Sequence, residues 1–196
     1  ANNKKEDLEG LGNVEIKVSD VQVSDNISLL DLSALDEDFK AELQSETTPS
    51  GELLPAKINY MKFGDGVNSV DTVVESREVP QKLIYATVEY TNKGTEELEE
   101  LLFFGSLMKF AEENGQIKRY DGKTFGPSAD WDDAVLTGAA RHVEMWYYDV
   151  HGGERNNNYI THLKAGETAT VHMAWLVPEE ELAYLYLNLD SYGDSY

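Results

Sequence analysis

Residues 163–190, LKAGETATVHMAWLVPEEELAYLYLNLD, decide the fold class of this chain. From Thr168 onward every second side chain is small or apolar, and this alternation predicts a β-strand with one buried face. The side chains on that face are Ala169, Val171, Met173, Trp175 and Val177. Pro178 is expected to end the strand because proline has no N–H to donate to a sheet, and a second strand is expected over residues 182–189. A buried face of this kind requires a second sheet to pack against it.

Two further stretches carry the same alternation. Residues 14–23 alternate between apolar and polar side chains but slip in phase at Ser19, which predicts a bulge or kink of the kind that lets one strand serve two sheets. Residues 82–90, KLIYATVEY, are rich in β-branched and aromatic residues. Leu83 and Tyr85 make the second face of this stretch apolar as well, which is typical of a central strand covered on both sides.

Turn and helix signals set the remaining elements. Residues 25–51 depart from the strand pattern. Their apolar residues are spaced by three and four positions, which predicts a short amphipathic helix at about 34–44. A capping box at Ser33 is expected to begin this helix. Asn114-Gly115 predicts a type I′ hairpin, because both residues tolerate positive φ. The other expected elements are strands over 53–63, 67–79 and 101–110, one helical turn at 134–140, a strand near 143–148 and an irregular polar loop at 151–158.

About nine expected strands, a single helix and short connections indicate an all-β fold, an antiparallel sandwich or barrel, rather than an α/β enzyme fold. Residues 1–12 are polar and carry glycine, which is typical of a flexible N-terminal leader. We therefore predict a single domain over residues 13–196, with insertions near 25–51 and 121–160.

The chain carries a net charge of −21, from 37 acidic and 16 basic side chains that are spread along it without a basic face. Binding to phosphate backbones depends on lysine and arginine displacing counterions, so we expect no binding to nucleic acids or anionic membrane surfaces. Cationic partners and divalent metals are electrostatically permitted. The absence of cysteine excludes disulfides, thiolate zinc sites and cysteine nucleophiles. No run of about 18 apolar residues is present to span a bilayer.

Three segments together resemble a known family. They are LIYATVEYTNKGTEE from Leu83, AEENGQIKRY around Asn114-Gly115, and LKAGETATVHMAWLVPEEE from Leu163. Over residues 13–190 the chain is similar to the immunoglobulin-like extracellular domains of unknown function in Gram-positive bacterial lipoproteins, grouped with the immunoprotective extracellular domain superfamily; residues 25–51 and 121–160 depart from it. The resemblance implies an immunoglobulin-like antiparallel β-sandwich with a short helical insertion, displayed outside the cell and anchored by a lipidated cysteine upstream of Ala1. It implies no catalytic motif.

Three aspartates in a loop that contains glycine and proline are the best calcium candidates: Asp130, Asp132 and Asp133. Calcium takes about six to eight oxygen ligands, and no stretch of this chain matches the twelve-residue EF-hand pattern. Solvated surface charge is therefore the alternative interpretation of these aspartates.

The four histidines lack the helical i, i+4 pairing that is typical of many zinc sites. His142 and Glu144 would share one face of an expected strand, which could begin a metal site. His162 and His172 would be able to meet across a hairpin. Histidines at the surface or on edge strands are the alternative interpretation.

Aromatic side chains of the same region indicate a ligand-binding patch. Trp131 lies in the aspartate-bearing loop, and Trp146 and Tyr148 share the strand face opposite to Tyr147. If that face is exposed it marks a binding patch, and if both faces are covered it belongs to the core. Carboxylates near aromatic rings also suit a carbohydrate-active hydrolase. No G-x-S-x-G motif and no phosphate-binding loop is present.

We predict from these patterns an exported, cell-surface binding module without catalytic activity. Its partner would be a protein, peptide or glycan of unknown identity, its domain would not insert into the membrane, and it would need no cofactor. A carbohydrate-active hydrolase and a calcium-stabilised structural domain are the alternatives.

Overall fold

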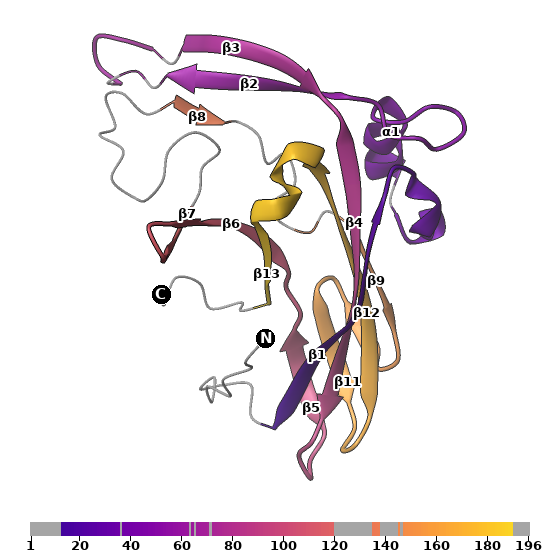
Figure 1. Cartoon of the computed structure of the whole chain (residues 1–196). Coiled ribbons are helices and arrows are strands. Elements are labelled where there is room, and N and C mark those ends of the chain that lie inside the picture. The colour runs from indigo at the N-terminus through magenta and orange to yellow at the C-terminus, as the bar shows by residue number, and fades with distance from the viewer. Residues whose placement is uncertain are drawn as a thin grey trace.

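The computed structural model of this chain consists mainly of antiparallel β-strands (Figure 1). It describes residues 13–35, 37–62, 64, 66–70, 72–119, 135–137, 145 and 147–189. All strand pairs within this described part are antiparallel. The expected all-β architecture, an antiparallel sandwich with a short helical segment, is confirmed. The leader expected over residues 1–12 lies outside the described residues.

The first layer is a four-stranded sheet in the order β1-β4-β12-β9. Its strands are β1 (Val14–Ser24), β4 (Gln81–Asn92), β9 (Tyr147–His151) and β12 (Thr168–Pro178). The central strands β4 and β12 pair with each other over the whole length of β12. Both faces of β4 are covered, because the neighbouring side chains Leu83 and Ile84 are both buried. This confirms the central strand that the sequence predicts.

Strand β1 carries the expected bulge. Its register against β4 shifts between Val18 and Asp20. Beyond the shift Val21 lies opposite Ala86, and before it Val18 lies opposite Val88, so the one extra residue keeps both valines on the same face. The expectation that this strand also serves a second sheet is wrong, because both of its halves pair with β4.

Two three-stranded sheets supply the second layer, in the orders β10-β11-β5 and β13-β6-β7. Their strands are β5 (Leu98–Leu102), β6 (Ser106–Glu113), β7 (Gln116–Arg119), β10 (Glu154–Asn156), β11 (Tyr159–Leu163) and β13 (Leu185–Asn188). The alternate side chains of β12 that the sequence predicts to be buried are at most 2% exposed. They form one core with Phe103, Leu107 and Ile160 of the second layer. The interleaving of two layers around β12 is thus confirmed.

A fourth sheet, β3-β2-β8, extends from one end of the sandwich (Figure 1). Its strands are β2 (Ala56–Lys62), β3 (Thr72–Val79) and β8 (Val135–Thr137). The structure describes residues 135–137 of the helical turn expected at 134–140, and for these residues the expectation is wrong. Pairing with β2 outweighs their local helical preference.

The loops also differ in part from the expected ones. Residues 151–158 contain β10, which pairs with β11, so the expectation of an irregular loop there is wrong. Gly152 and Gly153 adopt positive φ angles of 85° and 68°, and these conformations turn the chain tightly from β9 into β10. The Asn114-Gly115 hairpin between β6 and β7 is confirmed, because both residues have positive φ. After Pro178 a 3₁₀-helix, η3 (Glu179–Tyr184), precedes the last strand β13.

The helical segment (residues 25–51) covers part of the outer face of the first sheet. It contains the 3₁₀-helices η1 (Ile27–Leu29) and η2 (Leu32–Ala34) and the α-helix α1 (Glu37–Ser45). The capping box expected at Ser33 is wrong: Ser33 lies inside η2, and Asp31 caps it by accepting a 2.9 Å hydrogen bond from the Ser33 amide. Three leucines of this segment, Leu30, Leu35 and Leu43, form a second core with side chains of β4, β9 and β12. None of the described helices is long and apolar enough to cross a membrane.

Because three tyrosines are buried, we expect the free energy of unfolding to fall at alkaline pH. Burial raises the pKa of Tyr85 to about 12 and also raises the pKa of Tyr90 and of Tyr147. The unfolded chain therefore loses these phenol protons at a lower pH than the folded protein does. The contribution of the three tyrosines to the free energy of unfolding is complete below pH 10 and is lost as the pH rises toward 12. Urea unfolding measured at increasing pH across this window should show the decline. A free energy of unfolding that does not change there would contradict the burial of these hydroxyls.

Candidate metal centre

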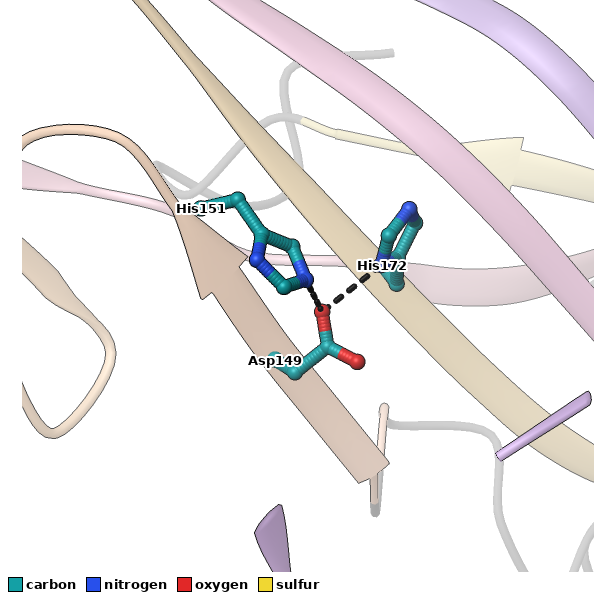
Figure 2. A group of neighbouring side chains, drawn as sticks. All are labelled: Asp149, His151 and His172. Atoms are coloured by element: carbon teal, nitrogen blue, oxygen red, sulfur yellow. Dashed lines mark hydrogen bonds and ion pairs between the residues drawn. The ribbon is translucent and has the colours of Figure 1, made fainter. Parts of the chain in front are cut away.

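The outer face of the first sheet carries a cluster of one carboxylate and two imidazoles. Alternation along β9 places Asp149 and His151 on the same face of the strand. Strand β12 pairs with β9 so that His172 lies directly opposite Asp149. All three side chains therefore project from adjacent strands toward one point on this face, and Figure 2 shows them converging there.

One oxygen of Asp149 is shared by both imidazoles. Its Oδ1 lies 2.6 Å from Nδ1 of His172 and 3.0 Å from Nε2 of His151 (Figure 2). The three donor atoms all lie within 4.8 Å of one another. The two imidazole rings are 5.3 Å apart, centroid to centroid, and nearly edge to face.

Neighbouring tyrosines hold the carboxylate and one imidazole in place. The Tyr147 hydroxyl donates a 2.5 Å hydrogen bond to Oδ2 of Asp149. The same hydroxyl accepts a 3.0 Å hydrogen bond from the backbone N–H of Asp31 in the helical segment. The ring of Tyr85 stacks on the imidazole of His172 at 5.3 Å. In metal sites, residues that contact the ligands and not the metal orient those ligands and tune their basicity.

The cluster lies at the boundary between the interior and solvent. Asp149 is only 8% exposed, whereas 66% of the His151 side chain is exposed. A buried carboxylate needs polar partners, and Asp149 has hydrogen bonds to Tyr147 and His172 and a close contact with His151. Hydrogen bonds from Ser33 lower the pKa of Asp31, and the nearby charge of His151 lowers it further. The carboxylates of Asp31 and Asp149 thus place negative charge near His151.

These donors fit a divalent transition-metal ion. Zinc binds imidazole nitrogen and carboxylate oxygen at about 2.0–2.2 Å in tetrahedral geometry, which places neighbouring donors roughly 3.3–3.5 Å apart. The present separations of 2.6 and 3.0 Å would have to widen by less than about 1 Å. Calcium fits the cluster poorly, since it prefers oxygen ligands only. Imidazoles instead favour zinc, copper or nickel.

Most of the site residues predicted from sequence lie outside the described residues. This holds for Asp130, Trp131, Asp132, Asp133 and Trp146. Tyr148 is described: it is half-buried, its ring meets Phe103 edge to face at 5.2 Å, and the guanidinium of Arg155 lies 5.2 Å from its centroid. Because Tyr148 alternates with Asp149 along β9, it faces the sandwich interior, on the opposite side of the sheet from the cluster. Its role in ligand binding stays a prediction.

The expected meeting of His162 with His172 is wrong. His162 lies on β11 in the second layer, where its Nδ1 is 3.3 Å from Oε1 of Glu97. His172 lies in the first layer. The two strands follow each other in the chain but belong to different sheets, so they do not form a hairpin. The pair His142 and Glu144 lies outside the described residues.

An open pocket of about 420 Å³ is lined in part by His162, and it shares no lining residue with the cluster. Its lining residues are Glu97, Gly153, Glu154, His162, Lys164 and Glu167. Among the residues that the structure describes, no tryptophan or tyrosine lines this pocket, so no aromatic platform for stacking a sugar is present there. It therefore lends no support to the carbohydrate-active alternative.

Sequence reasoning did not find the cluster, although part of its signal was local. Asp149 and His151 are two positions apart in a strand, which already places them on one face. His172 occupies the face of β12 opposite to Val171 and Met173. The missing information was the pairing of β9 with β12, which joins residues 23 positions apart in the chain.

The sequence matches no protein-family model, and comparisons with curated proteins and with solved structures likewise give no match.

Proposed function

We propose that this chain is a non-catalytic binding module whose ligand is a divalent transition-metal ion of the zinc class. The observation that supports this most strongly is the convergence of Asp149, His151 and His172, with all three donor atoms within 4.8 Å of one another. Two imidazoles and a carboxylate form a ligand set that zinc takes in proteins. The proposal specifies the ligand that the sequence patterns left open.

The charge of the molecule supports a cationic ligand. A net charge of −21 raises the local concentration of cations near the surface and disfavours anionic partners. The exposed His151 gives an ion direct access from solvent, while the buried Asp149 supplies a fixed negative charge. A location outside the cell, with an upstream lipid anchor, is part of this proposal and is supported by the sequence resemblance.

Isothermal titration of the metal-free protein with Zn²⁺ tests the function. We expect one equivalent to bind, with His151→Ala and His172→Ala each weakening the affinity by at least about a hundredfold, because each removes one of three ligands. At zinc concentrations about 100 times the dissociation constant, the free energy of unfolding should rise by about 2.7 kcal/mol.

His162→Ala is the matched control, because it removes an imidazole that also faces a carboxylate but belongs to the second layer. It should leave zinc affinity unchanged. Equal affinity in the wild type and the two cluster variants would refute the site. A larger rise in melting temperature with Ca²⁺ than with Zn²⁺ would favour the calcium-stabilised alternative instead.

A further inference from the structure

A continuous chain of hydrogen bonds joins the proposed metal ligands to the helical segment. Oδ1 of Asp149 faces the two imidazoles, and Oδ2 accepts the hydrogen bond from Tyr147 at 2.5 Å. The Tyr147 oxygen in turn accepts the backbone N–H of Asp31 at 3.0 Å. Two hydrogen bonds thus separate a ligand carboxylate from the backbone of the segment.

The same tyrosine is part of the surface on which the helical segment sits. Tyr147 is fully buried, and its ring belongs to the second core together with Leu30, Leu35 and Leu43 of the segment. Asp31 lies at the start of η2, between Leu30 and Leu35 in the chain. If the segment left the sheet, Tyr147 would lose both its apolar cover and its amide donor.

We infer that ion binding at Asp149, His151 and His172 and the docking of the helical segment stabilise each other. This inference rests on the proposed function. It makes the helical segment a metal-responsive element: the ion shifts the segment toward its docked position on the outer face of the first sheet.

The physical basis is orientation of the ligands. In the docked state the Asp31 amide holds the Tyr147 hydroxyl, and that hydroxyl holds the carboxylate with Oδ1 turned toward the imidazoles. In the undocked state water would compete for the hydroxyl, so the ligand oxygen would no longer be held. Loss of such an orienting partner typically weakens metal affinity about 10–100-fold. Since coupling between two equilibria is reciprocal, the ion favours the docked state by the same factor.

A second contribution comes from charge on the segment itself. Besides the hydrogen bonds from Ser33, the charge of His151 lowers the pKa of the Asp31 carboxyl group. An ion bound at His151 would attract this carboxylate, which belongs to the helical segment and not to the sheet. Both contributions act in the same direction.

Hydrogen–deuterium exchange of the full chain, with and without saturating Zn²⁺, tests the coupling. We expect zinc to slow exchange of the Asp31 amide and of amides in residues 27–45 by about tenfold or more in the wild type, as the reciprocal coupling requires. Tyr147→Phe keeps the buried ring but removes the hydroxyl. It should still bind zinc, about 10–100-fold more weakly, and its zinc-dependent slowing at saturation should fall to the small part that the Asp31 carboxylate contributes.

Tyr90→Phe is the matched control, because it removes a buried tyrosine hydroxyl from the opposite face of the first sheet, outside the chain of hydrogen bonds from Asp149 to Asp31. It should retain the wild-type response to zinc. Zinc binding by titration without any slowing in the wild type would overturn the coupling and leave the metal site standing. Slowing of wild-type size in Tyr147→Phe would also overturn it, whereas absence of zinc binding in the wild type would refute both proposals.

Discussion

Replacing Lys109 with methionine is expected to lower the free energy of unfolding by about 3–5 kcal/mol. Lys109 of β6 donates a 2.7 Å hydrogen bond to Oε1 of Glu181 in η3, and the two side chains are only 10% and 7% exposed. Oε2 of Glu181 has no hydrogen-bond partner among the described residues, so the lysine is the main compensation for this buried charge. Without it, the carboxylate is left desolvated and unpaired. Urea unfolding of the variant measures the loss.

The double variant Lys109→Met/Glu181→Leu separates the ion pair from the packing around it. Replacing both partners by apolar side chains of similar size is often close to neutral, because neither charge is then buried alone. We expect the double variant to recover most of the stability that Lys109→Met loses. A single variant as stable as the wild type would show that the pair is not buried in solution.

Replacing Trp175 with alanine is the second change with a large expected effect, about 3–5 kcal/mol of unfolding free energy. Trp175 is fully buried at the centre of the main core. The second layer approaches it so closely at Gly105 that a Cβ there would lie 2.9 Å from Cζ2 of Trp175. Removal of the indole would leave a cavity between the two layers that the rigid sheets can fill only in part.

Val23→Ala is the matched control for this prediction. Val23 lies on the edge strand β1, and it is 53% exposed. Truncating a half-exposed side chain removes little buried surface, so the expected loss is less than about 1 kcal/mol. Equal effects of Trp175→Ala and Val23→Ala in chemical unfolding would contradict the two-layer packing around β12.

The parts of the fold that could be predicted from sequence are those with a local physical signal. The alternation that ends at Pro178, the phase slip at Ser19 and the Asn114-Gly115 turn each constrain the backbone through neighbouring residues only. Short elements were missed because distant partners decide them. Val135–Thr137 is a strand through its pairing with β2, and Glu154–Asn156 is a strand through its pairing with β11.

The candidate site required information that no local pattern contains. Four histidines in a chain with 37 acidic residues give many accidental His–carboxylate spacings, so spacing alone could not single out Asp149. The register that sets His172 beside it depends on how β9 and β12 align along the whole sheet. The helical segment adds Asp31 to the site through its hydrogen bond to Tyr147 of β9, a contact that the sequence does not encode as a motif.

Anomalous diffraction from a crystal of the protein equilibrated with Zn²⁺ tests the metal site most directly. We predict a single strong peak at about 2.0–2.2 Å from Oδ1 of Asp149, Nε2 of His151 and Nδ1 of His172. A zinc-loaded crystal without a peak between these three atoms would contradict the proposed function.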